Sequence, residues 1–261
     1  MQVERPSLDL SERELRFGRW VQENGVGRFL FDLDDTISAT RHVIHGALSQ
    51  AANLLATDVP INSRDEWREQ INTIDSRLFE QHGVNAKRWN FTVNELAERY
   101  CLGEEIKQKM KQIFQQIYVT PLEMLEGAKE GLDFIKRVGV PIGIVTHAGS
   151  EWTLRKYNWL NLKRYVAWDE VYIVDENGHK TSESWAKAIR FFGLTAIECA
   201  VVGDSPRSDI NPAWEAGVRH CFLVEDTNLW AIHNQPVNQS VRIIGSLSQI
   251  AEAVLGQQLS K

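Results

Sequence analysis

The sequence has few cysteines, no long apolar run and no excess of positive charge. Three cysteines in 261 residues, an odd number without close spacing, exclude a disulfide framework and a zinc knuckle. We expect all three to be core thiols in a reducing compartment: Cys101, Cys199 and Cys221. No apolar stretch approaches the roughly 18 residues of a membrane span, and the formal charge of −6 disfavours binding to a nucleic-acid polymer or an anionic lipid surface.

The amino terminus lacks the apolar stretch of a signal peptide. Glu4, Pro6 and Asp9 stand where that stretch would lie, so we expect a cytoplasmic protein. Hydrophobic residues make up 43% of the chain and charged residues 25%, which is typical of globular proteins. A chain of this length can bury a sizeable core in one large domain or in one domain with an insertion.

Short apolar runs alternate with helical patterns over most of the chain. The expected strands span residues 29–31, 142–145, 171–174, 199–202, 220–224 and 241–244. The patterns between the later strands predict helices, with a closing helix at 247–255. This alternation predicts an α/β fold with a Rossmann-like parallel sheet flanked by helices. A capping box formed by Ser11 and Glu14 predicts one more short helix ahead of the first strand.

Residues 39–119 follow a different pattern, in which apolar residues recur only at helical spacing. Two further capping boxes, Ser63 with Glu66 and Thr92 with Glu95, predict helix starts within this segment. Four helices with short connections favour an antiparallel bundle. We therefore predict a helical domain at 39–119, inserted into a core domain formed by 1–38 and 120–261.

Polar residues follow three of the expected strands directly. Asp32 and Asp34 come after the first strand, Thr146 ends the second, and the Gly-Asp-Ser of 203–205 ends the fourth. The carboxyl ends of parallel strands meet at one sheet edge, where ligands bind in open α/β sheets. These side chains are therefore expected to converge on one site.

The same residues lie in four motifs that resemble those of the haloacid dehalogenase superfamily. In chain order they are FDLDDT at 31–36, IVTHAG at 144–149, the lysine at position 180 and VVGDSPRSD at 201–209. The resemblance spans about residues 29–209, and the helical insert is similar to the cap domain that many members carry there. The resemblance implies a Mg²⁺-dependent hydrolase of a phosphate monoester.

The residue types support this chemistry independently of the family. Carboxylates gathered at one sheet edge repel one another unless a hard cation lies among them, and Mg²⁺ prefers oxygen ligands. With Mg²⁺ and Lys180 offsetting the charge, Asp32 can attack phosphorus and form an aspartyl-phosphate. Asp34 is poised to protonate the leaving oxygen and then to activate water.

The remaining members of the site follow from position and resemblance. Thr146 supplies a hydroxyl donor to a phosphoryl oxygen, and Asp204 completes the metal site with Asp32. The family implies that the backbone carbonyl of Asp34 is a further metal ligand. It also implies that Asp209 holds Lys180 or a metal-bound water without binding the metal itself.

Structural interpretations remain open for single features. Each acidic motif alone could be an ordinary turn at a strand end. Lys180 could be a solvated turn lysine, and Lys187 is then the alternative cation. Asp35 stands where many family members have glycine. His147 could contact substrate, or its side chain could simply be satisfied by the loop.

Several residues outside the motifs could also reach substrate. Arg41, His42 and His45 lie just beyond the first motif, although a solvated helix face is the favoured interpretation. The tryptophans of the expected helices are assigned to core packing and to no binding role: Trp67, Trp152, Trp159, Trp185 and Trp214.

The favoured function is hydrolysis of a small phosphorylated metabolite. A phosphomutase shares all four motifs and is the nearest alternative. A dehalogenase is disfavoured because, in the family, it lacks the second aspartate found here as Asp34. A phosphonatase needs a Schiff-base lysine in the cap, but the charged surroundings of Lys107, Lys109 and Lys111 argue against it. A non-catalytic protein that keeps the fold is a further possibility. The pattern assigns neither the natural substrate nor the oligomeric state.

Overall fold

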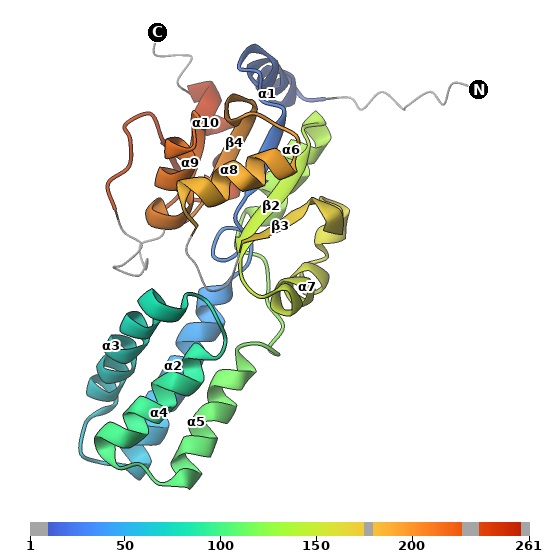
Figure 1. Cartoon of the computed structure of the whole chain (residues 1–261). Coiled ribbons are helices and arrows are strands. Elements are labelled where there is room, and N and C mark those ends of the chain that lie inside the picture. Colours follow the sequence, from blue (N-terminus) through green and yellow to red (C-terminus); the bar gives the residue numbers. More distant parts are fainter. Residues whose placement is uncertain (1–9, 175–179, 226–234, 257–261) are drawn as a thin grey trace.

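A six-stranded sheet forms the centre of the computed structural model, which describes residues 10–174, 180–225 and 235–256 (Figure 1). The strands lie in the order β3-β2-β1-β4-β5-β6 and every neighbouring pair is parallel. Their bounds are β1 (Arg28–Phe31), β2 (Ile142–His147), β3 (Val171–Val174), β4 (Cys199–Gly203), β5 (His220–Val224) and β6 (Arg242–Ile244). The predicted parallel α/β sheet is confirmed.

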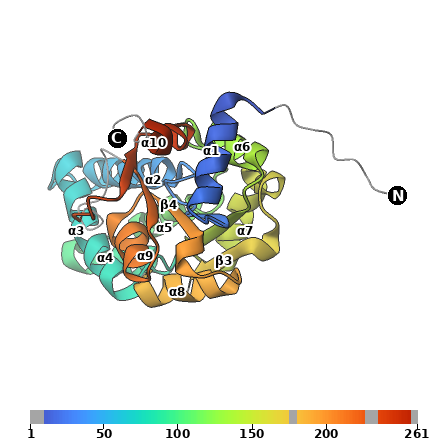
Figure 2. The same cartoon turned by 90° about the horizontal axis from the view of Figure 1, so that it is seen from above.

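Helices cover both faces of this sheet (Figure 2). Phe29 and Phe31 of β1 pack with the apolar side chains of α1, α6 and α10, whereas Leu30 packs with those of α8 and α9. Successive residues of a strand point to opposite faces, so one short apolar run supplies both layers of the core. The helices of this part are α1 (Glu12–Glu23), α6 (Ala128–Val138), α7 (Ser150–Trp159), α8 (Ser182–Phe191), α9 (Asn211–Glu215) and α10 (Glu252–Leu255).

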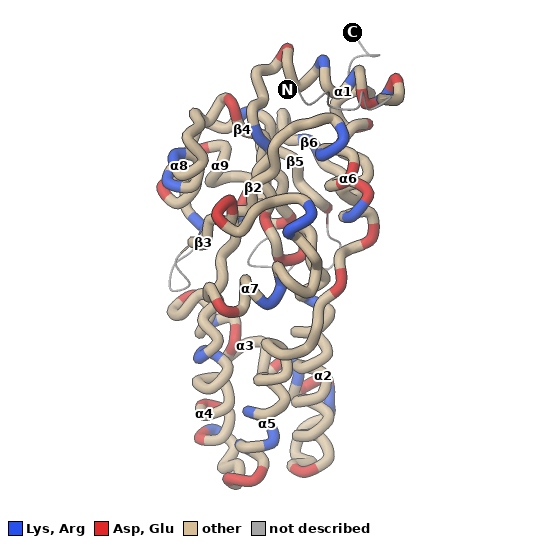
Figure 3. The backbone as a smooth tube through the Cα atoms, turned by 90° about the vertical axis from the view of Figure 1, so that its right-hand side faces the viewer, with Lys and Arg blue, Asp and Glu red and all other residues tan. Residues whose placement is uncertain are grey.

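The segment between β1 and β2 is helical, as predicted, and projects from the carboxyl edge of the sheet (Figure 1). Its four long helices are α2 (Thr40–Asp58), α3 (Arg64–His82), α4 (Arg88–Tyr100) and α5 (Glu104–Gln116), and α6 leads back to the sheet. Trp67, Ile71, Val93 and Met110 are buried in a core of its own. Acidic and basic residues are interspersed along these helices (Figure 3). We refer to α2–α5 as the bundle.

Two of the three predicted capping boxes are present. Ser11 caps α1 with Glu14, and Ser63 caps α3 in the same way. The box predicted at Thr92 is wrong, because α4 already begins at Arg88. Thr92 therefore lies inside the helix, where its hydroxyl donates to the Arg88 carbonyl at 3.1 Å.

Two smaller expectations also need correction. Cys101 is exposed at the left-handed end of α4, so it is no core thiol, whereas Cys199 and Cys221 are buried. The closing helix is divided into a 3₁₀ turn at Leu247–Gln249 and α10. Within the described residues, no helix combines the length and apolar character needed to cross a membrane.

Candidate active site

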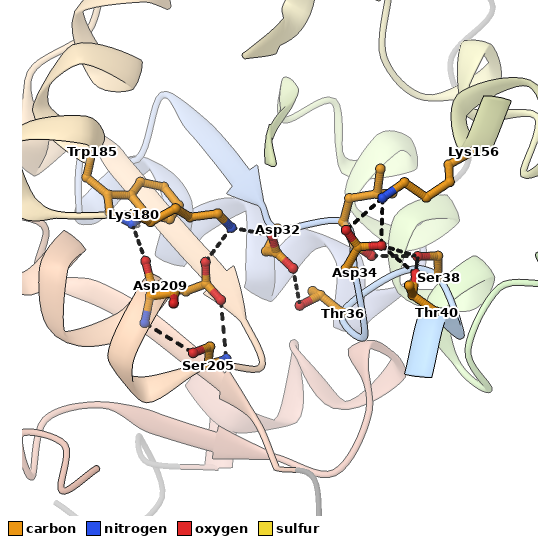
Figure 4. A network of polar contacts seen from close by, with 12 residues as sticks. Asp32, Asp34, Thr36, Ser38, Thr40, Lys156, Lys180, Trp185, Ser205 and Asp209 are labelled. Atoms are coloured by element: carbon orange, nitrogen blue, oxygen red, sulfur yellow. Dashed lines mark hydrogen bonds and ion pairs between the residues drawn. The ribbon is translucent and has the colours of Figure 1, made fainter. Parts of the chain in front are cut away.

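Asp32 lies at the carboxyl end of β1 and is 4% exposed. Its backbone N–H donates to the Val202 carbonyl at 2.9 Å, which extends the pairing of β1 with β4 by one residue. The Lys180 ammonium donates to one Asp32 carboxylate oxygen, and Thr36 Oγ1 donates to the other at 3.3 Å (Figure 4). Strand pairing and side-chain contacts thus fix this carboxylate in place.

Asp204 and Asp209 approach Asp32 from the turn that follows β4. One carboxylate oxygen from each of the three aspartates lies within 4.8 Å of the others. Gly203 makes this possible, since a Cβ at that position would come within 2.5 Å of Asp209 Cβ. Asp209 accepts hydrogen bonds from Lys180 Nζ at 2.7 Å and from the Ser205 N–H at 3.2 Å. The three carboxylates form a candidate metal site.

The electrostatics of this group fit a divalent cation. Burial raises the pKa of Asp32 to about 7, although Lys180 acts in the opposite direction. Burial, reinforced by the charges of Asp32 and Asp209, also raises the pKa of Asp204 well above its ordinary value. Burial opposes the charge on Lys180, but Asp209 and Asp32 together still raise its pKa. A hard cation with oxygen ligands would restore the ionised carboxylates.

Asp34 is held by a residue that the sequence did not reveal. Lys156 of α7 is completely buried, and its ammonium contacts both Asp34 carboxylate oxygens at 2.7 Å (Figure 4). Thr40 Oγ1 also donates to this carboxylate. Burial opposes ionisation of Asp34, but Lys156, with help from Thr40 and Lys180, lowers its pKa. On sequence alone Lys156 is one helix lysine among many, and only the packing of α7 against the sheet edge singles it out.

Arg41, at the start of α2, was expected on a solvated helix face, and this expectation is wrong. Its side chain is buried and lies 3.2 Å from Asp204 and 3.4 Å from Asp35. The Arg41 N–H also donates to Asp35 at 2.8 Å. Asp35 has a φ of 57°, in the left-handed region where glycine is favoured. His42 is exposed and His45 is half-buried, so the solvated interpretation fails for Arg41 in particular.

The other predicted residues are distributed as follows. Thr146 is fully buried near the end of β2, and its hydroxyl has no hydrogen-bond partner among the described residues. Such a buried polar group calls for a ligand or water. His147 is buried and lines the cavity described next. Lys187, the alternative to Lys180, is exposed and pairs with Glu183 at 2.9 Å.

A cavity extends from the sheet edge to the bundle. Asp32, Lys180 and Asp204 line one end of it, and side chains of α2, α3, α4 and the segment after α5 line the other. The tryptophans that were assigned to core packing differ in their surroundings. Trp67 and Trp185 are completely buried, as predicted, but Trp152 lines the cavity.

The family is established by sequence. Residues 29–223 match the family model described as haloacid dehalogenase-like hydrolase. The chain therefore belongs to the haloacid dehalogenase-like hydrolases, with a helical insertion after β1 and a buried group of three aspartates. No curated protein sequence matches it significantly.

Solved structures share the fold over most of the chain. A haloacid dehalogenase-like family hydrolase from Xanthomonas campestris has a TM-score of 0.72 at 17% identity, covering 90% of this chain and 93% of its own. A HAD phosphatase from Thermococcus onnurineus scores 0.58 at 21% identity, with 88% and 98% covered. The HAD hydrolase YfnB from Bacillus subtilis, bound to magnesium, scores 0.60 at 19% identity, with 87% and 97% covered. Dehalogenases have this fold too, so the likeness does not select the reaction.

Proposed function

We propose that this protein is a Mg²⁺-dependent phosphatase that hydrolyses a small phosphate monoester through an aspartyl-phosphate at Asp32. One observation carries the proposal: Asp32 contacts Lys180 and lies beside the carboxylates of Asp204 and Asp209. A phosphate dianion approaches a carboxylate only where positive charge offsets the repulsion. Lys180 supplies one such charge, and the carboxylate group is suited to hold a divalent cation that supplies the rest.

The proposed metal ligands are the side chains of Asp32 and Asp204 and the backbone carbonyl of Asp34. When bound, Mg²⁺ would neutralise charge on the phosphoryl oxygens and help to orient them. Asp209 holds Lys180 beside Asp32 and keeps its ammonium charged. The Thr146 hydroxyl, which lacks a protein partner, is suited to donate to a phosphoryl oxygen.

Catalysis then proceeds in two steps carried by the two aspartates. Asp32 attacks phosphorus, the bond to the leaving oxygen breaks, and Asp34 gives that oxygen a proton. In the second step Asp34 takes a proton from water, which attacks phosphorus and releases phosphate and the Asp32 carboxylate. The contact with Lys156 favours ionised Asp34, the form that takes a proton from water in the second step. For the first step Asp34 must take up a proton, and its other oxygen can then still accept from Lys156.

Asp34 is also the feature that favours a phosphatase over a dehalogenase. Release of a halide needs no proton, whereas release of an alkoxide from a phosphate ester does. A second carboxylate kept in place by Lys156, Thr40 and Ser38 is expected for the phosphate ester reaction. Phosphonatase chemistry gains no support, because Lys107, Lys109 and Lys111 are absent from the cavity lining.

The proposal is tested with p-nitrophenyl phosphate, a generic monoester, in Mg²⁺ and in EDTA. We expect turnover that requires Mg²⁺ and that Asp32→Asn abolishes. Asp65→Asn, the same change at an exposed site on α3, serves as the control and should retain full activity. Release of halide from 2-chloropropionate without release of phosphate from any monoester would overturn the proposal.

A phosphomutase remains the second candidate, because the cavity lies under a bundle that could exclude water. A phosphomutase should transfer phosphate between two positions of a sugar faster than it releases free phosphate. Measuring both products from one hexose phosphate separates the two enzymes.

A further inference from the structure

The bundle end of the cavity is lined mainly by aromatic and aliphatic side chains. The rings come from α3, α4, the segment after α5, and α7, and aliphatic side chains lie between them. This apolar wall consists of Phe79, Trp89, Tyr118, Trp152, Ile44, Val84 and Ile117. The opposite end of the same cavity, at the sheet edge, consists mostly of charged residues.

The rings of the apolar wall are fixed by contacts with one another and with the bundle core. Trp89 stacks on Phe114 with ring centroids 4.5 Å apart and an interplanar angle of 9°. Its indole N–H donates to the Tyr118 hydroxyl at 3.1 Å. Tyr118 in turn meets Trp152 edge to face at 5.0 Å. Rings held in this way form a rigid surface and lose little entropy when a ligand binds.

The principal charged groups of this wall already pair with each other. Asp75 accepts from Arg88 Nε at 2.6 Å, and the Arg88 guanidinium also donates to the Gly83 carbonyl. The same guanidinium lies 5.0 Å from the centre of the Phe79 ring and 4.9 Å from that of Trp89. A leaving group rich in hydroxyls would have to compete with these contacts, because the other polar groups at this end are Ser76 and the Tyr118 hydroxyl, which already accepts from Trp89.

We propose that the preferred substrate is a phosphate monoester whose alcohol carries an aromatic or heteroaromatic ring. The phosphate lies at Asp32 and Lys180, and the ring lies against Phe79 and Trp152, which are partly exposed and line the cavity. This inference rests on the proposed phosphatase and narrows its substrate class. Aromatic side chains with fixed offset and edge geometry favour a planar ring over a saturated one of similar size.

Three esters of primary alcohols test the proposal, because their leaving groups are chemically alike. We expect kcat/KM for benzyl phosphate to exceed that for glycerol 3-phosphate by at least about tenfold. We expect kcat/KM for benzyl phosphate to exceed that for cyclohexylmethyl phosphate by about threefold to tenfold. A glycerol 3-phosphate value equal to or above that for benzyl phosphate overturns the proposal, and so does equality of the two ring esters.

A pair of variants assigns the preference to the apolar wall. Phe79→Leu should lower kcat/KM for benzyl phosphate about threefold to tenfold more than kcat/KM for glycerol 3-phosphate. Phe91→Leu makes the same change on an exposed ring of α4 that does not line the cavity, and should alter neither. An equal loss for both esters in Phe79→Leu contradicts the assignment. If Phe79→Leu does not fold, the ranking of the three esters by the unaltered protein still decides.

A binding measurement separates failure of this inference from failure of the proposed phosphatase. 2-Phenylethylphosphonate, 2-cyclohexylethylphosphonate and 3,4-dihydroxybutylphosphonate replace the ester oxygen of the three substrates by a methylene group and are not hydrolysed, so calorimetry gives their affinities without turnover. If no ester is hydrolysed but 2-phenylethylphosphonate binds most tightly, the phosphatase proposal fails and the aromatic site stands. If esters are hydrolysed but 2-phenylethylphosphonate binds no more tightly than the other two, the aromatic site fails and the phosphatase stands.

Discussion

The two ends of the cavity are built by different means. At the sheet edge, charged side chains from separate segments meet around Asp32, and short contacts such as that of Lys180 with Asp209 hold them. At the bundle, aromatic side chains carried by helices form the wall, and one buried ion pair supports them. In our proposal the residues at the strand ends carry out the reaction, whereas the side chains of the packed helices select the substrate. Single substitutions can disturb one end of the cavity at a time.

The largest effect is expected at the sheet edge, from Lys180→Met. Removing the ammonium leaves Asp32 and Asp209 buried without their shared partner. We expect a loss of about 3–5 kcal/mol in the free energy of unfolding, measured with urea in EDTA, together with a loss of most activity in Mg²⁺. Lys187→Met removes an exposed lysine and should change stability by less than about 0.5 kcal/mol. Equal behaviour of the two variants would contradict the account of the site.

The corresponding change in the bundle is Arg88→Met. It leaves Asp75, which is 1% exposed, without its cation, and we expect a loss of about 3 kcal/mol in stability. Arg88 lines the bundle end of the cavity and is not part of the proposed catalytic group. We therefore expect kcat to fall much less than in Lys180→Met. The control is Arg77→Met, which breaks a half-exposed pair with Glu95 worth less than about 1 kcal/mol. A large loss of kcat in Arg88→Met would show that the two ends do not act separately.

Lys156→Met tests the residue that holds Asp34. We expect kcat to fall by about 10-fold to 100-fold while KM changes little, because the side chain positions a proton-transfer group and is not expected to bind the phosphate. Lys156→Arg should restore part of the rate, since it keeps the positive charge. Lys163→Met alters an exposed lysine as the control. A change confined to KM would place Lys156 in substrate binding.

The smallest effect is expected where the two ends are joined. Arg207, in the turn after β4, forms a two-pronged ion pair with Glu80 of α3 at 2.7 and 2.9 Å. The pair is partly exposed, so Glu80→Gln should cost less than about 1 kcal/mol and alter KM about twofold, with a weaker effect at high salt. Glu69→Gln on the same helix should be neutral. A tenfold effect of Glu80→Gln would show that this contact controls closure of the bundle over the site.

The sheet edge could be predicted from the sequence because its residues follow strands directly. Asp32 and Asp204 each follow a short apolar run, and a parallel sheet brings the carboxyl ends of such strands to one edge. The strands and the inserted helices could also be predicted, because the spacing of apolar residues along the chain indicates each element without knowledge of the tertiary structure.

The residues that helices bring to the site and to the cavity could not be predicted in the same way. Trp152 and Lys156 lie on a helix whose apolar pattern predicts burial but not the neighbour that a side chain meets. Arg41 resembles a solvated arginine until Asp204, 163 residues later in the chain, is brought against it. Thr92 shows a limit even of local signals, because its capping pattern occurs inside a helix that had already started.

If Asp32 carries the phosphoryl group during turnover, the acyl phosphate can be trapped on this residue. Protein quenched during turnover of p-nitrophenyl phosphate is treated with borohydride, which reduces an acyl phosphate to an alcohol, and its peptides are analysed by mass spectrometry. We expect homoserine at position 32 only when both substrate and Mg²⁺ are present. Rapid turnover with an unmodified Asp32, or reduction at another carboxylate, would contradict the account.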